Sequence, residues 1–436
     1  MMDLKLLVPF TIPFEALIMA VRYNPCKQQG RTLMKTLTKV ATLTFALLGT
    51  ASLAAVTTMN ASSSTSSAAA SGSFVTIPAM PNEASSSQVV TLPTPLGMEY
   101  SSSTPAISGS GAAHHAPVPA LTAAAGKALP GINISGGEFG KVPGRVGYDY
   151  NYPKNSDIDY FASKGFKLIR IPFRWQRLQP DLFGPLSAPD RTALNKAVLY
   201  ANSKGLTVAL DMHDYSARLV NARAARVGTA ELPASALTDV WTRIGEDYKG
   251  NDKVWIGIMN EPSGIAISDW WKVAQEVTNA LRSKAINNKL LVPGGSWSGA
   301  HSWLKSGNSS YAEKFRDPKG NFAFEVHQYF DKDSSGTQPQ CVAGSGKRLG
   351  AALDWAQRND VKLFVGELAG SGDAQCAIEY GEALSALNAS SNVIGWAAWG
   401  GGAWWAKAYM FRLNPIAIGG PETAHMALLT KSLSAQ

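Results

Sequence analysis

From residue 129 onward, short apolar runs alternate with longer segments in which apolar residues recur at helical spacing. The apolar runs, rich in Val, Ile and Leu, predict eight strands, at 131–134, 167–172, 207–212, 255–260, 290–293, 323–329, 362–366 and 393–399. The segments between them predict helices that include 190–204, 236–249, 268–286, 346–359 and 377–388. Strands that alternate with helices form parallel sheets, and eight such pairs in about 300 residues predict a (β/α)8 TIM barrel.

An open, doubly wound sheet is the alternative for the same order of elements. Such a sheet carries a G-x-G-x-x-G turn after its first strand, where the backbone approaches a dinucleotide. Gly136, Gly137 and Gly140 follow the first predicted strand without that spacing. The sequence therefore favours the barrel, and it predicts no nucleotide site and no cofactor.

The first 128 residues differ in composition from the rest of the chain. Lys35 and Lys39 precede an apolar run and then small residues, which is typical of a secretory signal peptide, so we expect one at 34–55, after an upstream extension at 1–33. A membrane anchor is the alternative, but Glu15 and nearby prolines disfavour a spanning helix. Residues 56–128, mostly Ser, Ala, Thr, Pro and Gly, predict a disordered linker. We therefore expect a secreted chain with one large domain at 129–436 and no membrane segment in the mature form.

Charge and cysteine content narrow the possible functions. The net charge is +8, but the basic residues are scattered, whereas a protein that binds nucleic acid clusters them on one face. Cys26 would be lost with the signal peptide, which leaves Cys341 and Cys376. In an oxidising compartment this even pair predicts a disulfide, with two separate buried thiols as the alternative.

Polar residues stand at the ends of nearly all the predicted strands. In a barrel, the carboxyl ends of the strands open into a shared bowl, where catalytic residues lie. The residues at these ends are Arg170, Asp211, His213, Asn260, Glu261, Glu325, His327, Tyr329, Glu367 and Trp399. Because side chains alternate along a strand, Glu325, His327 and Tyr329 share one face, and so do Asp211 and His213. Pro262 is expected to end the fourth strand and to free Asn260 and Glu261 to reach one ligand.

Glu261 and Glu367 form the pair of carboxyl groups that glycoside hydrolysis requires, one as an acid and one as a carboxylate opposite it. A single strand-end glutamate would as readily form a structural ion pair. Here hydrogen-bonding side chains accompany both carboxyl groups, and Trp297, Trp399, Trp404 and Trp405 offer flat faces that pack on sugar rings. Four other tryptophans are expected in the core: Trp175, Trp241, Trp255 and Trp355.

Six segments resemble glycoside hydrolase family 5, and most closely its fungal and bacterial endoglucanase branch. They are GINISGGEF from Gly131, LIRIPFRW from Leu168, ALDMHDY from Ala209, VWIGIMNEP from Val254, FEVHQYFDKDSSGTQPQC from Phe324 and FVGEL from Phe364. The eight positions that the family uses around the cleaved sugar have counterparts in Arg170, His213, Asn260, Glu261, His327, Tyr329, Glu367 and Trp399. The resemblance implies a TIM barrel, retention of anomeric configuration, no metal and a β-1,4-glucan substrate.

The resemblance also implies a role for each site residue. Glu367 would be the nucleophile and Glu261 the proton donor and general base, with Arg170, His213, Asn260, His327 and Tyr329 as supporting residues. Trp399 would floor the subsite of the cleaved sugar, Trp297 would stack on a neighbouring sugar, and Trp404 and Trp405 would line the cleft. Cys341 and Cys376 match a disulfide of the branch. The chain is expected to act as a monomer on β-glucan polysaccharides or oligosaccharides.

Three other functions remain open at this point. The same fold and mechanism would serve β-mannan or mixed-linkage glucan, because glucose and mannose differ only at the 2-hydroxyl. A carbohydrate-binding protein without catalysis would have lost one of the two glutamates, and both are present. A metal-dependent barrel hydrolase using Asp211, His213 and His327 would carry a paired H-x-H at the end of its first strand, which is missing here.

Overall fold

The computed structural model describes residues 128–417 and 419–434. Within them, eight parallel strands close into a barrel in the order β1-β10-β9-β8-β7-β6-β3-β2. These strands are β1 (Leu129–Ile134), β2 (Leu168–Phe173), β3 (Thr207–Met212), β6 (Val254–Gly257), β7 (Leu290–Pro293), β8 (Phe322–Tyr329), β9 (Leu363–Ala369) and β10 (Val393–Gly401). The prediction of a (β/α)8 barrel is therefore confirmed. The predicted extension and signal peptide lie outside the described residues, as does the predicted linker up to residue 127.

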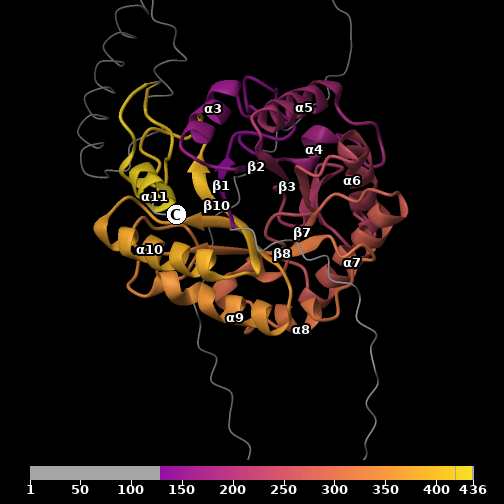
Figure 1. Ribbon diagram of the computed structural model, residues 1–436. Helices are drawn as coiled ribbons and strands as arrows, with labels where there is room; N and C mark the ends of the chain where they lie inside the picture. The colour runs from indigo at the N-terminus through magenta and orange to yellow at the C-terminus, as the bar shows by residue number, and fades with distance from the viewer. Residues whose placement is uncertain (1–127, 418, 435–436) are drawn as a thin grey trace, which may run out of the picture. The chain divides into compact units, whose positions relative to one another are not determined.

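Helices surround the strands on the outside of the barrel (Figure 1). They are α3 (Asn155–Ser163), α4 (Trp175–Leu178), α5 (Ala188–Ser203), α6 (Ala234–Tyr248), α7 (Ile267–Ser283), α8 (Asn308–Ala312), α9 (Gly350–Arg358), α10 (Ala374–Ala389) and α11 (Ala424–Ser434). Helix α6 shows why they pack there: Leu237, Val240, Trp241 and Ile244 recur at helical spacing and are all buried. The indole of Trp241 packs on Phe173 of β2 and donates a hydrogen bond to the Ile258 carbonyl. One apolar stripe thus joins the helix to the barrel.

The interior of the barrel is filled by a layer of side chains drawn from its strands. The members of this layer are Leu168, Ala209, Trp255, Leu291, Ala323, Phe364 and Ala397. Three of them precede polar strand-end residues by two positions, as Leu168 precedes Arg170 and Ala209 precedes Asp211. Because residues two apart on a strand face the same side, the polar residues form the next layer toward the carboxyl ends. The apolar layer therefore floors the bowl in which the site lies.

Some predicted boundaries are wrong. The fourth strand was expected to reach Asn260, but β6 ends at Gly257 and the last three predicted residues belong to the following loop. The seventh strand continues to Ala369 rather than 366, because its pairing with β8 extends that far. The helix expected at 346–359 begins as a 3-10 turn, η3 (Ser345–Leu349), before α9. The antiparallel hairpin of β4 (Ala217–Val220) and β5 (Arg223–Arg226) was not predicted, since its short polar strands lack an apolar run.

The predicted disulfide joins Cys341, in the loop after β8, to Cys376 in the first turn of α10. The two cysteines are 35 positions apart, so the bond restricts a sizeable loop in the unfolded chain. Reduction is expected to lower the free energy of unfolding by about 2 to 4 kcal/mol. Thermal unfolding with and without a reductant measures this effect, and an unchanged melting temperature would contradict it.

None of the described helices is long and apolar enough to cross a membrane.

Candidate active site

Arg170 of β2 lies at the centre of the polar layer and is 1% exposed. Its guanidinium forms ion pairs with three carboxylates: Asp211 at 2.9 Å, Glu325 at 3.0 Å and Glu367 at 3.0 Å. It also donates hydrogen bonds to the side-chain oxygens of Asn133 and Asn260. These buried acidic partners outweigh the effect of burial on the pKa of Arg170 and raise it further. A fixed cation therefore lies beside the Glu367 carboxylate.

Glu367 lies on β9, and both of its carboxylate oxygens are held. Oε1 accepts from Arg170 at 3.0 Å, and Oε2 accepts from the Tyr329 hydroxyl at 2.5 Å. Burial alone would raise the pKa of Glu367, but the charges of His327, Arg170 and His213 and the Tyr329 hydrogen bond hold it below its usual value. Glu367 is therefore an ionised, oriented carboxylate at neutral pH.

Glu261 reaches the site from a strained turn. Its φ of 39° lies in the left-handed region, which is costly for a residue with a β-carbon, and Pro262 follows it. The backbone N–H of Asn260 donates to the Met212 carbonyl of β3 at 2.7 Å, which anchors this loop beside the barrel. Burial raises the pKa of Glu261; the hydrogen bond from His327 opposes this shift, and the negative charge of Glu367 adds to it. The protonated form is thus favoured for Glu261 and the ionised form for Glu367, as in a proton donor and a nucleophile.

His327 of β8 connects the carboxyl groups. Its Nδ1 lies 2.8 Å from Glu261 Oε1 and 3.6 Å from Glu367 Oε2, while its Nε2 lies 3.3 Å from Glu325 Oε1. Burial would lower the pKa of His327, but the charge of Glu367 and the hydrogen bonds to Glu261 and Glu325 raise it to about 10. With both nitrogens facing carboxylates, the ring fits a doubly protonated imidazolium. It places a positive charge between the two glutamates that glycoside hydrolysis would use.

A register shift between β8 and β9 makes this arrangement possible. Val326 pairs with Val365, but His327 pairs with Glu367, so Gly366 is an extra residue on β9. A Cβ atom on Gly366 would lie 2.0 Å from Glu325 Oε1 and 2.8 Å from His327 Nε2. Only a glycine therefore fits where these two side chains pass.

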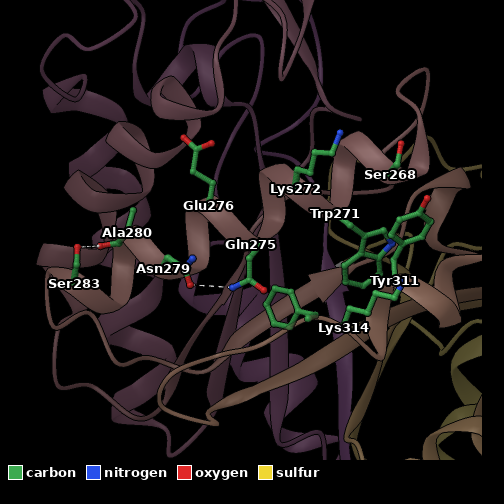
Figure 2. Close-up of a pocket in the computed structure, with 11 residues that line it drawn as sticks. Ser268, Trp271, Lys272, Gln275, Glu276, Asn279, Ala280, Ser283, Tyr311 and Lys314 are labelled. Carbon is green, nitrogen blue, oxygen red and sulfur yellow. Dashed lines mark hydrogen bonds between the residues drawn. The ribbon is translucent and has the colours of Figure 1, made fainter.

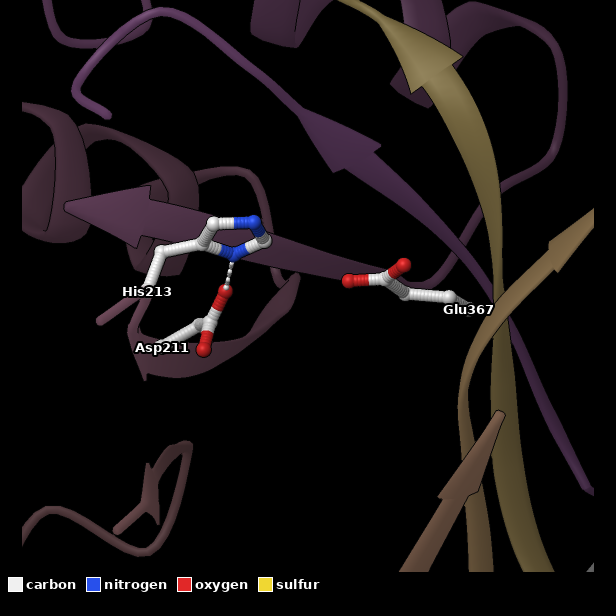
Figure 3. A group of neighbouring side chains, drawn as sticks. All are labelled: Asp211, His213 and Glu367. Carbon is white, nitrogen blue, oxygen red and sulfur yellow. Dashed lines mark hydrogen bonds and ion pairs between the residues drawn. The ribbon is translucent and has the colours of Figure 1, made fainter. Parts of the chain in front are cut away.

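His213 approaches Glu367 from the other side of the bowl. Figure 3 shows the Glu367 carboxylate pointing toward the His213 imidazole. Nδ1 of this imidazole forms a hydrogen bond with Asp211 Oδ2 at 2.7 Å. Its Nε2 lies 3.0 Å from the Tyr215 hydroxyl. Burial would lower the pKa of His213, but the charge of Asp211 and the hydrogen bond to it raise this pKa above its usual value.

The predicted aromatic residues lie in different environments. Trp399 is 8% exposed, stacks on His213 at 5.4 Å between ring centres, and donates its indole N–H to Tyr409 at 3.0 Å. Trp405 stacks on Tyr409 at 3.7 Å. Trp404 is 36% exposed, and Trp297 is 60% exposed on a turn where its own φ is 56°. Trp399 and Trp405 thus form a packed wall, and Trp297 and Trp404 present free surface. The four tryptophans expected in the core are all buried.

Comparison with known proteins assigns this architecture to a family. A family model described as cellulase (glycosyl hydrolase family 5) matches residues 124–406, which is more than half of the chain. The chain belongs to glycoside hydrolase family 5. It is 28% identical over 323 residues to endoglucanase 1 of Robillarda sp. (strain Y-20), a match that covers 68% of this chain and 84% of that protein.

Solved structures agree with this assignment. XacCel5A in complex with cellopentaose is 37% identical with a TM-score of 0.67, covering 70% of this chain and 99% of that one. The endoglucanase Cel5A of Pseudomonas stutzeri in complex with cellobiose is 31% identical with a TM-score of 0.64, covering 70% and 92%. The protein is accordingly a glycoside hydrolase with a TIM-barrel fold.

The structure of this hydrolase adds residues to those predicted for the site. Glu325 was recognised only as a strand-end polar residue, and Asp211 was given no role beyond that of a possible metal ligand; they hold Arg170, His327 and His213. Asn133 of β1 was missed; its amide donates to the Gly366 carbonyl at 2.8 Å and its oxygen accepts from Arg170 at 2.9 Å. A lone asparagine in the apolar run GINI was the available signal for it.

In two groups of described side chains, the atoms that could bind a metal ion lie within 4.8 Å of one another. They are Asp211, His213 and Glu367, and Glu261, His327 and Glu367. The raised pKa of each histidine disfavours the neutral imidazole that a metal needs. His213 and His327 also fall in separate groups, unlike the single centre considered from the sequence. Hydrogen-bonded ion pairs account for both groups, and the absence of a catalytic metal stays a prediction.

A large groove lies elsewhere on the hydrolase, on the outer face of α7 and α8. Figure 2 shows residues that line the groove, among them Trp271, Lys272, Gln275, Tyr311 and Lys314. The volume of the groove is about 790 Å³. None of its lining residues stands at a strand end, so it is separate from the candidate active site.

Proposed function

We propose that this family 5 hydrolase is an endo-β-1,4-glucanase that cleaves β-glucan chains with retention of configuration. The relatives are named endoglucanases, and two of the similar structures hold cellopentaose and cellobiose. The observation that carries the proposal is the pairing of Glu261 and Glu367, which have carboxylate oxygens within 4.8 Å of each other. Retaining enzymes hold their carboxyl groups about 5 to 5.5 Å apart, whereas inverting enzymes need about 6.5 to 9.5 Å for a water.

In the first step, a Glu367 oxygen attacks the anomeric carbon as Glu261 donates its proton to the glycosidic oxygen. The bond from the anomeric carbon to that oxygen breaks, and the leaving chain departs with a hydroxyl. A glycosyl ester to Glu367 remains. The low pKa of Glu367 and the raised pKa of Glu261 support this division of roles.

In the second step, Glu261 is a carboxylate and takes a proton from water, whose oxygen attacks the same carbon and releases Glu367. Two inversions at one carbon restore the original configuration. Asn260, held by Arg170 at 2.8 Å, would donate from its amide to the 2-hydroxyl of the sugar. Trp399 would floor the subsite of the cleaved sugar, Trp297 would stack on a neighbouring sugar, and Trp404 and Trp405 would line the cleft.

The pH dependence of kcat/KM follows from the two carboxyl groups. The first step needs Glu367 ionised and Glu261 protonated, so the rate falls as the pH drops through the pKa of Glu367 and as it rises through that of Glu261. Since the first is below and the second above the usual value of 4.5, a bell-shaped profile is expected. Initial rates on a soluble cello-oligosaccharide between pH 3 and pH 9, roughly, measure it. A rate that climbs steadily to the alkaline end would contradict the role of Glu261.

The choice of substrate is tested by initial rates of the full chain on cellopentaose and mannopentaose. Faster hydrolysis of cellopentaose is the expected result. Preference for mannopentaose would keep the mechanism and overturn the glucanase assignment. Turnover of neither by a folded protein would favour a carbohydrate-binding role.

The proposed enzyme acts outside the cell as a monomer. Export is supported by the charged, apolar and small-residue order at 34–55 and by the Cys341–Cys376 disulfide, which persists in oxidising compartments.

A further inference from the structure

Two buried polar side chains, Tyr380 and His425, meet beside the end of β9, the strand that carries Glu367. Tyr380 belongs to α10 and is 1% exposed, and His425 belongs to the first turn of α11 and is 3% exposed. The two helices pack side by side on the outside of the barrel (Figure 1). The Tyr380 hydroxyl lies 2.5 Å from Nε2 of His425. A buried hydrogen bond therefore joins the helices close to the site.

The Tyr380 hydroxyl also contacts the backbone that follows Glu367. It accepts the N–H of Gly370 at 3.2 Å and lies 3.3 Å from the carbonyl oxygen of Leu368, the residue next to Glu367. The pairing of β9 with β8 ends at Ala369, so Gly370 is the first residue beyond it. The hydroxyl thus fixes the end of the strand at the point where the Glu367 side chain leaves it.

His425 connects this hydroxyl to a second segment of the chain. Its Nδ1 lies 3.0 Å from the carbonyl oxygen of Phe411, and because a carbonyl only accepts, Nδ1 must carry a hydrogen. Burial lowers the pKa of His425 to about 4, so the ring is neutral and Nε2 accepts the hydrogen of the Tyr380 hydroxyl. The two ring nitrogens therefore hold two different partners at once.

Phe411 leads back to Glu367 from the other side. Its ring is 1% exposed and stacks on the ring of Tyr329, with 6.1 Å between the ring centres and 29° between the planes. The hydroxyl of Tyr329 donates to Glu367 Oε2 at 2.5 Å. His425 thus links the backbone beside Glu367 to the ring that packs behind the hydrogen-bond donor of its carboxylate.

The start of α11 has little freedom to move. A Cβ atom on Gly372, in the loop after β9, would lie 2.6 Å from both the Cβ of Ala424 and the backbone nitrogen of His425. Phe411 and His425 both follow residue 406, where the match to the family model ends. The last segment of the described chain therefore packs directly against the strand end that carries Glu367.

A nucleophile must be held within a few tenths of an ångström of its attacking position, and a displacement of about 1 Å can cost about 100-fold in rate. We propose that Tyr380 and His425 are positioning residues for Glu367, which keep its carboxylate aligned with the Tyr329 hydroxyl and with the anomeric carbon. Neither residue touches the sugar in this proposal. The inference rests on the proposed function, because it takes Glu367 as the nucleophile.

The test compares the full-length wild type with Tyr380→Phe, using kcat and KM for cellopentaose and the pH profile of kcat/KM. The variant keeps the ring, which packs edge-on against Phe330 at 4.9 Å, and removes only the hydroxyl. The kcat is expected to fall about 10-fold or more while the KM stays within about two-fold, because the nucleophile shifts and the sugar contacts do not.

The acid side of the same pH profile gives a second reading. The hydrogen bond from Tyr329 helps to hold the pKa of Glu367 down, so a misaligned carboxylate should lose activity at a higher pH than in the wild type. An unchanged kcat and an unchanged acid side in folded Tyr380→Phe would overturn the proposal even if the melting temperature falls. A purely structural role would lower the stability alone.

Tyr248→Phe is the matched control. Tyr248 is 4% exposed, and its hydroxyl forms a hydrogen bond with Asn195 between α6 and α5, away from the strand ends. This variant also loses a buried hydroxyl, but its kcat and its pH profile should match those of the wild type.

Variants of His425 decide the question if Tyr380→Phe does not fold. His425→Leu removes both ring nitrogens, and its kcat should fall as in Tyr380→Phe. His425→Gln has an amide that can accept from Tyr380 and donate to Phe411, so it should recover most of the kcat. Equal kcat values for the two variants would overturn the proposal. Wild-type chain that leaves cellopentaose intact would contradict the proposed function itself, whereas an active wild type with unaffected variants contradicts only this inference.

Discussion

Glu367→Gln is expected to lower kcat on cellopentaose by at least about 10⁴-fold, because an amide cannot form the glycosyl ester on which both steps depend. The side chain keeps its size, and its oxygen can still accept the hydrogen bond from Tyr329. Arg170 loses one negative partner but retains Asp211 and Glu325. The fold should therefore persist, and circular dichroism with thermal unfolding verifies this alongside the kinetics.

The same substitution at Glu379 is the control for Glu367→Gln. Glu379 is also buried and hydrogen-bonded, but it braces a turn before α9 and takes no part in the proposed chemistry. Its Gln variant should keep kcat near the wild-type value. Residual activity of Glu367→Gln within a factor of about 10 of wild type would rule out Glu367 as the nucleophile.

Arg170→Ala is expected to destabilise the protein by about 3 to 5 kcal/mol and to abolish activity. The variant leaves Asp211, Glu325 and Glu367 buried within the barrel without the cation that each of them contacts. Removing one member of a buried ion pair is costly because the remaining charge has lost both water and its partner. Denaturant unfolding, monitored by tryptophan fluorescence, gives the change in free energy.

Arg191→Ala is the comparison for this loss of stability. Arg191 pairs with Asp247 on the surface, with half of its side chain exposed, so its removal should cost no more than about 1 kcal/mol. Equal losses for the two arginines would show that Arg170 does not balance the buried carboxylates.

The fold was predictable because its signals are local and repeated. Each strand is a short apolar run, and each long helix has a buried stripe like that of α6, so the alternation of elements could be followed along the chain. The polar strand ends were visible for the same reason, since a residue such as Arg170 is conspicuous in an apolar run. Because residues two apart on a strand share a face, Glu325, His327 and Tyr329 could be predicted to lie together, and all three side chains make contacts in the candidate site.

The features that the sequence did not predict depend on contacts between distant segments. The extra residue at Gly366 exists because β9 must pass Glu325 and His327, and a glycine alone does not reveal a register shift. The left-handed backbone conformation of Glu261 could not be predicted, because glutamate rarely adopts it. Asn133 was missed because its partners, the Gly366 carbonyl and Arg170, come from other strands. Local sequence patterns were thus enough to predict where the candidate site lies, whereas the arrangement of its charges could be described only from the folded structure.

The anomeric configuration of the first products tests the double displacement most directly. The full chain is mixed with cellopentaose in an NMR tube, and the anomeric proton signals are followed from the earliest spectra, before mutarotation mixes the anomers. The close pairing of Glu261 and Glu367 predicts that the β-anomer of the newly formed reducing end appears first. Initial release of the α-anomer would mean a single inversion and would contradict a glycosyl-enzyme intermediate on Glu367.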